Sequence, residues 1–142
     1  MTHRECMADI PMFRELDPVL ASALMDAIIS VATEKTMETG ALVFGKGDQS
    51  IDDGYILLEG EVRVLKEGNR TLVTGAPAML GEVAQFHPAM RRTADVLAHT
   101  PLRVLHFSWR RLEDALTERL GDEKRQALTD VLVDYAWDHF GS

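Results

Sequence analysis

The chain opens with a segment whose apolar residues recur at helical spacing. Asp17 and Pro18 suit the start of a helix, because an aspartate side chain caps free N–H groups and proline fits the first turn. The apolar residues that follow would share one face of this helix: Val19, Leu20, Ala23, Leu24, Ala27 and Ile28. The pattern predicts an amphipathic helix over about residues 17–30.

Between about residues 31 and 107 the apolar residues form short segments instead. Segments rich in Val, Ile, Leu and Tyr are separated by glycines at positions 40, 45, 47, 54, 60 and 68, and two further apolar segments occupy residues 93–97 and 102–107. Because glycine allows the tight turns that join antiparallel strands, this pattern is typical of a small antiparallel β structure.

The C-terminal part of the chain returns to helical spacing. Ser108 can cap a helix and Gly121 can end it. The leucines between them recur every four residues: Leu112, Leu116 and Leu120. A last helix runs towards Phe140 with these residues on one face: Leu128, Val131, Leu132, Tyr135 and Ala136. We therefore expect one domain over residues 1–142, with an N-terminal helix (about 17–30), a β region (about 31–107) and two C-terminal helices (about 108–140).

Composition and charge exclude several classes of protein. The chain has 142 residues, a usual size for one domain, and carries 15 Lys and Arg against 23 Asp and Glu, for a formal net charge of -8. A chain of this charge is repelled by phosphate backbones, so we expect no direct binding of nucleic acid. No apolar segment approaches the roughly 20 residues of a membrane helix, and the N-terminus lacks the apolar core of a signal peptide. We expect a cytoplasmic protein that does not contact a membrane.

The residues that usually carry catalysis or metal binding are sparse. Cys6 is the only cysteine, which excludes an internal disulfide and a four-thiolate zinc site and fits a reducing compartment. The histidines lack the spacing of metal ligands: His3, His87, His99, His106 and His139. No nucleophile has an adjacent base and no P-loop is present, so we expect neither an enzyme nor a metal cofactor.

The segment GEVAQFHPAMRRTADV, residues 81–96, carries the candidate chemistry. If the chain turns at Gly81 into a short helix, the free N–H groups at the start of that helix attract an anion. Arg92 begins the extended run that follows, and a guanidinium can donate two charge-assisted hydrogen bonds to phosphate, each contributing about 1.5–3 kcal/mol. Glu82 would repel phosphate unless it pairs with the arginine or accepts a hydrogen bond from a sugar hydroxyl. The residues fit a nucleotide site or, alternatively, a structural Glu82–Arg92 ion pair on a turn.

The same residues resemble the phosphate-binding cassette of a known family. That cassette reads Phe-Gly-Glu-x-Ala, a variable loop, then Arg-x-Ala-x-Val; here LGEVA stands at residues 80–84 and RTADV at residues 92–96. Upstream, Gly47-Asp48 and the segment YILLEGEVRV at residues 55–64 resemble the family's turn and strand pair. The chain thus resembles the cyclic nucleotide-binding domain, the sensor shared by the catabolite activator protein, the regulatory subunits of cyclic nucleotide-dependent kinases and the cyclic nucleotide-gated channels.

The resemblance implies a mainly β fold, a jelly-roll-like β-roll of about eight strands with flanking helices, and a ligand that is cyclic AMP or cyclic GMP. It implies that Arg92 binds the cyclic phosphate and that Glu82 accepts a hydrogen bond from the ribose 2′-hydroxyl. Backbone groups of Gly81, Val83 and Ala84 would contact the ribose and phosphate, and Thr93 would contact phosphate or base, which allows cyclic GMP. Tyr135 and Trp137 on the last helix are candidates for a lid over the base.

The sequence departs from the family's pattern in places. Leu80 replaces the aromatic, Gln85 replaces a leucine, and Asp95 stands where Thr, Ser, Asn or a large apolar residue is usual. If the strand alternates, Asp95 points away from the face that carries Arg92. Arg91 is a second candidate for the phosphate, although the family spacing fits from Arg92.

Three other functions compete with a nucleotide sensor. A degenerate fold without ligand could act as a protein interaction module. A cupin enzyme would need clustered histidines, and a transcription factor would need a helix-turn-helix beyond the last helix, for which we see no room before Ser142. The apolar face of the last helix predicts either a homodimer seam or packing on the chain's own β-roll.

Overall fold

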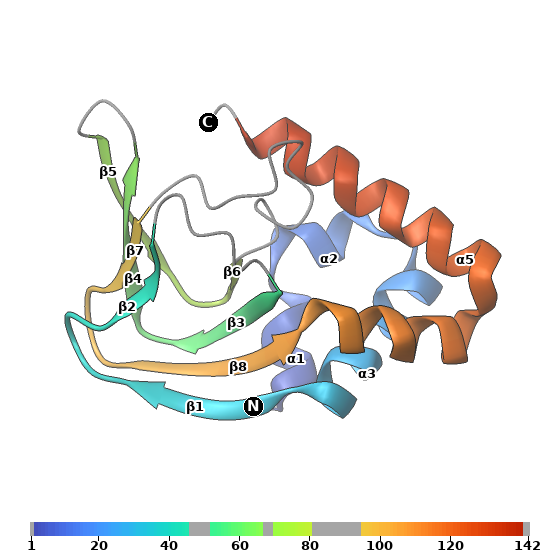
Figure 1. The fold of residues 1–142 in the computed structure, drawn as a ribbon, viewed down its shortest axis with the longest axis horizontal. Helices are drawn as coiled ribbons and strands as arrows, with labels where there is room; N and C mark the ends of the chain where they lie inside the picture. The colour runs from blue at the N-terminus through green and yellow to red at the C-terminus, as the bar shows by residue number, and fades with distance from the viewer. Residues whose placement is uncertain (1, 46–51, 67–69, 81–94, 141–142) are drawn as a thin grey trace.

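The helices of the molecule gather at one end of a β-roll (Figure 1). The computed structural model describes residues 2–45, 52–66, 70–80 and 95–140, and residues 66, 70 and 134–140 are described by their backbone alone. The helices are α1 (His3–Ala8), α2 (Pro11–Glu15), α3 (Pro18–Val31) and α5 (Trp109–Phe140). The strands are β1 (Thr33–Met37), β2 (Leu42–Phe44), β3 (Asp53–Glu59), β4 (Glu61–Lys66), β5 (Arg70–Gly75), β6 (Ala78–Leu80), β7 (Asp95–Ala98) and β8 (Leu102–Ser108).

Helix α3 begins where the sequence predicts, and for the predicted reason. The Asp17 carboxylate accepts hydrogen bonds from the backbone N–H groups of Val19 (2.9 Å) and Leu20 (3.4 Å), and Pro18 occupies the first helical position. The predicted apolar face is wrong at Val19, whose side chain is 65% exposed. The buried face consists of Ala21, Leu24, Met25, Ala27 and Ile28. Helices α1 and α2 were not predicted, because with six and five residues they are too short to show a helical period.

The eight strands form two antiparallel sheets of four. One sheet has the order β1-β8-β3-β6 and the other β2-β7-β4-β5. Within the first sheet β1 pairs with β8 and β3 with β6, and within the second sheet β2 pairs with β7 and β4 with β5. This is the strand pairing of a jelly roll. The predicted jelly-roll-like β-roll with flanking helices is therefore confirmed.

Strand β3 lies inside the first sheet and is covered on both faces. Tyr55 and Leu57 point into a core between the two sheets, whereas Ile56 and Leu58 point into a second core beneath the helices. A strand buried on both faces has no solvent side, which explains why this part of the sequence is continuously apolar and does not alternate.

Glycines occupy the second position of β3 and the position just after its end, and each has a steric reason. Gly60 follows the strand with φ 100°, and a Cβ there would lie 2.3 Å from the carbonyl oxygen of Pro101. Gly54 packs beneath an aromatic ring, because a Cβ there would lie 2.5 Å from two ring carbons of Phe107. Larger residues at either position would displace their neighbours.

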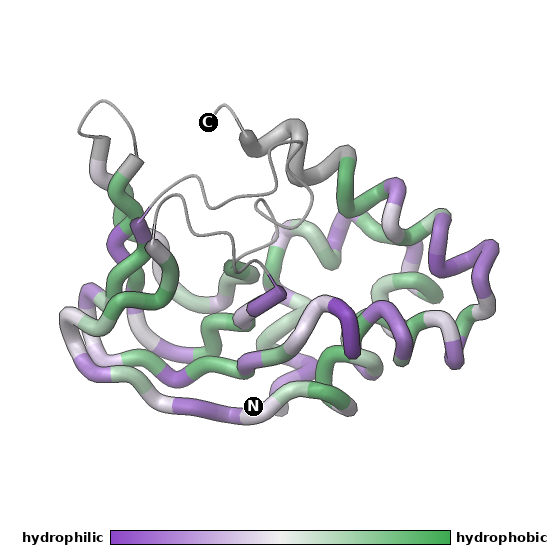
Figure 2. The backbone as a smooth tube through the Cα atoms, viewed as in Figure 1, coloured by the Kyte–Doolittle hydropathy of each residue, from purple (hydrophilic) through white to green (hydrophobic). Residues whose placement is uncertain are grey.

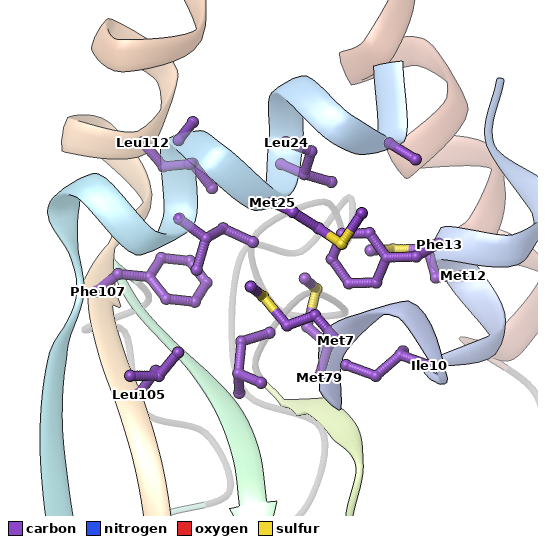
Figure 3. Close-up of a cluster of buried hydrophobic side chains, with 14 of the residues drawn as sticks. Met7, Ile10, Met12, Phe13, Leu24, Met25, Met79, Leu105, Phe107 and Leu112 are labelled. Atoms are coloured by element: carbon purple, nitrogen blue, oxygen red, sulfur yellow. The ribbon is translucent and has the colours of Figure 1, made fainter. Parts of the chain in front are cut away.

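The core beneath the helices joins the described helices α1, α2, α3 and α5 to the first sheet. Figure 3 shows side chains from α1, α2, α3 and α5 meeting those of β6 and β8. The residues labelled there are Met7, Ile10, Met12, Phe13, Leu24, Met25, Met79, Leu105, Phe107 and Leu112. Cys6 belongs to the same core, where its Sγ lies 3.9 Å from the carbonyl oxygen of Leu58, and burial raises the pKa of this thiol.

Polar and charged side chains tie helix α1 to the first sheet. Arg103 on β8 donates hydrogen bonds to Glu59 (2.8 Å) and Glu34 (3.0 Å), and His3 of α1 lies 3.0 Å from the same Glu34 carboxylate. The hydrogen bond with Glu59 raises the pKa of Arg103 above its already high usual value. The arginine thus stays charged at neutral pH.

Helix α5 consists of two arms that meet at Gly121, the residue predicted to end the first C-terminal helix. Gly121 has φ 80° and ψ 168°, outside helical values, and we call residues 109–120 the first arm and residues 122–140 the second arm. Figure 1 shows α5 running away from β8 and then doubling back, and Figure 2 colours the bend mostly hydrophilic. In the second arm, Leu128 and Leu132 are buried in the core beneath the helices, whereas Val131 is 40% exposed. The predicted common face of these residues is therefore wrong at Val131.

Candidate functional site

The two ends of the candidate segment attach to different sheets. Strand β6 ends at Leu80 in the first sheet, and β7 begins at Asp95 in the second. The predicted site residues between them lie outside the described residues: Gly81, Glu82, Val83, Ala84, Arg92 and Thr93. Gly47 and Asp48 also lie outside them, and for Tyr135 and Trp137 only the backbone is described. What the structure describes is the surface of the roll from which the segment leaves and to which it returns.

An aromatic contact bridges the sheets between these two ends. Tyr55 lies directly opposite Leu80 in the β3–β6 pair, and Phe44 lies opposite Val96 in the β2–β7 pair. The rings of Phe44 and Tyr55 are 5.2 Å apart in an edge-to-face arrangement. The two ends of the segment are thus held near each other on the inner face of the roll.

A polar pair adjoins the aromatic contact. The ring of His106 on β8 lies 4.9 Å from that of Tyr55, and its Nε2 is 2.7 Å from Oδ1 of Asp53. The side chains of His106 and Asp53 are 25% and 45% exposed. This end of the inner face therefore offers hydrogen-bonding groups beside apolar surface.

The β4–β5 hairpin extends the inner face as an open apolar surface. Val64 lies opposite both Leu72 and Val96, so these three side chains share the face that carries the fully buried Val62. Leu72 is nevertheless 48% exposed. We call the side chains on the inner faces of the two sheets around the ends of the segment the apolar wall: Phe44, Tyr55, Val64, Leu72, Leu80 and Val96. Sequence reasoning missed this wall, although the alternation of Val62 and Val64 with polar residues at 61 and 63 is a signal of it.

Asp95 does not contribute to the wall. Along β7, Val96 and Ala98 are buried, whereas Asp95 and Leu97 are only partly buried. Asp95 therefore points away from the core between the sheets, which is the orientation that strand alternation predicts. This departure from the family pattern leaves the inner face unobstructed.

The described residues contain no cluster suited to a metal ion. Within residues 2–45, 52–66, 70–80 and 95–140, no three His, Cys, Asp or Glu side chains converge in this way. His3 and His106 pair with carboxylates, those of Glu34 and Asp53. None of the helices in this part of the chain combines the length and the apolar character that crossing a bilayer requires.

A comparison with protein-family models identifies the family. The model of the cyclic nucleotide-binding domain matches residues 34–119, which is more than half of the chain. The chain belongs to the cyclic nucleotide-binding domain family. The match runs from β1 to the end of the first arm of α5, so it includes the apolar wall and the whole candidate segment. No curated protein sequence matches the chain significantly.

Solved structures share the fold of this cyclic nucleotide-binding domain. A protein from Geobacter metallireducens, described as a cyclic nucleotide-binding protein, is 23% identical with a TM-score of 0.67, and the match covers 97% of this chain and 95% of that chain. The sensor domain of the transcriptional regulator DNR from Pseudomonas aeruginosa is 21% identical with a TM-score of 0.62 (82% and 81% covered). The N-terminal domain of a transcriptional regulator from Streptomyces coelicolor is 25% identical with a TM-score of 0.62 (90% and 86% covered).

Proposed function

We propose that this domain is a sensor that binds cyclic AMP or cyclic GMP between the apolar wall and residues 81–93. The observation that carries the proposal is the position of the wall. A segment with the residues of a phosphate receptor leaves the roll after Leu80 and returns at Asp95, next to Val96. Leu80 and Val96 belong to the apolar wall, of which Leu72 is 48% exposed. A cyclic nucleotide has the matching composition, with a charged phosphate at one end and a flat purine at the other.

Each part of the ligand has a counterpart in this arrangement. The Arg92 guanidinium binds the cyclic phosphate, because hydrogen bonds between charged groups are stronger than those between neutral ones. Backbone groups of Gly81, Val83 and Ala84 contact the ribose and the phosphate. Glu82 accepts a hydrogen bond from the ribose 2′-hydroxyl. The purine packs against Val64 and Leu72, and covering this exposed apolar surface is favourable by about 25 cal/mol per Å². Thr93 contacts phosphate or base, and it is the residue through which cyclic GMP is accepted.

The last helix transmits occupancy in this proposal. Ligand binding stabilises one position of the C-terminal helix, with Tyr135 or Trp137 as a lid over the base, and so changes what this helix can contact. A homodimer forms through the same helix, for which Val131 offers an exposed apolar residue. The domain acts by binding its ligand and not by catalysis. Its net charge of -8 disfavours direct binding of nucleic acid. The free thiol of Cys6 fits a reducing compartment such as the cytoplasm.

The test is calorimetric titration of the protein with cyclic AMP and cyclic GMP. We expect binding by the parent and a loss of at least about tenfold in affinity, about 1.4 kcal/mol, in Arg92→Ala. Arg91→Ala is the matched control, since it removes the same charge one residue earlier, and it is expected to keep the affinity within about threefold. Equal affinity in the parent and Arg92→Ala assigns the phosphate to another residue. Binding of neither nucleotide by the parent favours the alternative, a degenerate domain that acts as a protein interaction module.

A further inference from the structure

The start of α5 is capped by a residue that is distant in the sequence. Asp52 accepts hydrogen bonds from three groups at this helix end. Its side chain accepts from the Ser108 hydroxyl (Oδ2, 2.6 Å) and from the Arg110 N–H (Oδ1, 3.0 Å). The backbone carbonyl of Asp52 accepts from the Trp109 N–H (2.8 Å). Ser108 in turn accepts a hydrogen bond from the Arg111 N–H (3.3 Å). The first three N–H groups of the helix are satisfied, two of them by Asp52.

This cap joins the first arm of α5 to the strand beside the candidate site. Asp52 immediately precedes β3, and β3 carries Tyr55 of the apolar wall. The next two residues continue the junction, because Asp53 pairs with His106 and Gly54 packs beneath the ring of Phe107. Three consecutive residues thus contact the end of β8 and the start of α5. The first arm is bound to the sheet by polar and apolar contacts at once.

The bend of α5 at Gly121, by contrast, is not fixed by side-chain packing or by a cap from another strand in the part of the chain that the structure describes. Gly121 has a φ of 80°, and a Cβ placed there would meet no atom within 4 Å. Residues 121–124 are exposed. No atom lies within 4 Å of the place where a Gly121 side chain would be, so packing does not hold the backbone at this point. The second arm is held only further along, where Leu128 and Leu132 are buried in the core beneath the helices, and a displacement that begins at Gly121 has to shift these two side chains. Among the described residues, the start of the first arm is thus fixed by hydrogen bonds and packing that its other end, at Gly121, does not have.

From this contrast we infer that Asp52 is a positioning residue that fixes the first arm of α5 to β3, so that movement of α5 is confined to the second arm, beyond Gly121. The part of this inference that concerns ligand rests on the proposed function. Asp52 makes the first arm move with the sheet that forms part of the apolar wall, and Gly121 becomes the place where the position of the helix changes. Occupancy of the wall is then read out by residues 122–140.

The experiment measures amide hydrogen exchange by NMR in the parent and in Asp52→Ala, without ligand and with cyclic AMP or cyclic GMP. In the ligand-free parent we expect the amides of Trp109 and Arg110 to be protected and the second arm to exchange independently of the first. In Asp52→Ala, protection at Arg110 is expected to fall at least about tenfold, and the first arm is expected to exchange together with the second. Unchanged protection at Arg110 and along the first arm would overturn the inference.

With ligand, the parent is expected to change its exchange in the second arm only, whereas Asp52→Ala changes it in both arms. Asp52→Asn can still accept the hydrogen bond from Arg110, so it is expected to restore the confined response. Asp17→Ala is the matched control, because it removes a helix cap of the same chemistry from α3. It is expected to leave the response of α5 unchanged.

The two proposals fail in different ways. A ligand response within the first arm of the parent contradicts the role of Asp52 while leaving nucleotide binding intact. If neither nucleotide binds to the parent, the proposed function and the ligand-dependent part of the inference fail together. The ligand-free comparison still decides whether Asp52 holds the first arm.

Discussion

Leu128 and Val131 lie about one turn apart in the second arm of α5. Replacing each by alanine tests whether this arm is held by packing within its own chain, at Leu128, or by contact with a second chain, at Val131. Leu128 is fully buried in the core beneath the helices, whereas Val131 is 40% exposed. Replacing a buried leucine by alanine costs about 2–5 kcal/mol, because transfer free energy is lost and a cavity remains. Replacing a partly exposed valine in a helix costs less than about 1 kcal/mol, since part of the loss is offset by the better helix propensity of alanine.

These costs translate into melting temperatures. With about 2.1 cal/mol/K of unfolding entropy per residue, a chain of 142 residues loses roughly 3 °C for each 1 kcal/mol. Leu128→Ala should therefore lower the Tm by about 7–17 °C, and Val131→Ala by less than about 3 °C. The assay is thermal unfolding followed by circular dichroism, repeated over a hundredfold range of protein concentration.

The concentration series shows which face of the helix is used. If Leu128 packs within its own chain, its effect on the Tm is the same at every concentration. A larger effect of Val131→Ala that grows with protein concentration identifies a dimer seam at that residue. Equal, small shifts in both variants would refute the packing of the second arm against the core described above.

Two further predictions concern the cores. Gly54→Ala should destabilise the protein by about 1–3 kcal/mol, because the new methyl group would lie 2.5 Å from the Phe107 ring carbons; urea unfolding measures this, and an unchanged midpoint would contradict the close packing. Burial raises the pKa of Cys6, so iodoacetamide at pH 8 should alkylate the folded protein much more slowly than the urea-unfolded protein. The raised pKa also means that the folded state holds the thiol proton more tightly. The contribution of Cys6 to the free energy of unfolding is therefore fully present below the ordinary pKa of a thiol, and it is lost as the pH rises through the raised pKa of the folded state. Equal alkylation rates in the two states would show that Cys6 is accessible.

Local patterns predicted the elements whose signals are contained within a few neighbouring residues. Asp17-Pro18 gave the start of α3, and Gly121 gave the break in α5, because caps and positive φ depend on nearby backbone. The same reasoning placed Val131 with Leu128 on one apolar face. Burial there depends on what packs against the helix, and two of the helices that share its core, α1 and α2, are short and were not predicted.

In the candidate site, too, local sequence signals predict some residues, whereas others depend on contacts between distant parts of the chain. Residue types and spacing predict Glu82 and Arg92, since they would carry the chemistry of a phosphate and a sugar, and both stay predictions because they lie outside the described residues. The apolar wall could not be found in this way, because Leu72 belongs to it only through the register of β5 on β4 and of β4 on β7. Asp52 is a similar case, because its contacts with Ser108 and Arg110 span more than fifty residues of sequence.

The continuous burial of β3 leaves its alignment with the neighbouring strands undetermined by hydrophobicity. In a strand with one wet face, a shift by one residue would carry apolar side chains into water, and this penalty fixes the pairing. The run YILL at residues 55–58 offers no such penalty, since a shift would only exchange these four side chains between two dry interiors. Gly54 and Gly60 can supply the missing information, because only hydrogen fits beneath the Phe107 ring and beside the Pro101 carbonyl. These two glycines would then fix the register of β3 against its neighbours β8 and β6. Because β3 contributes side chains to both cores, its register also decides which side chains face the second sheet.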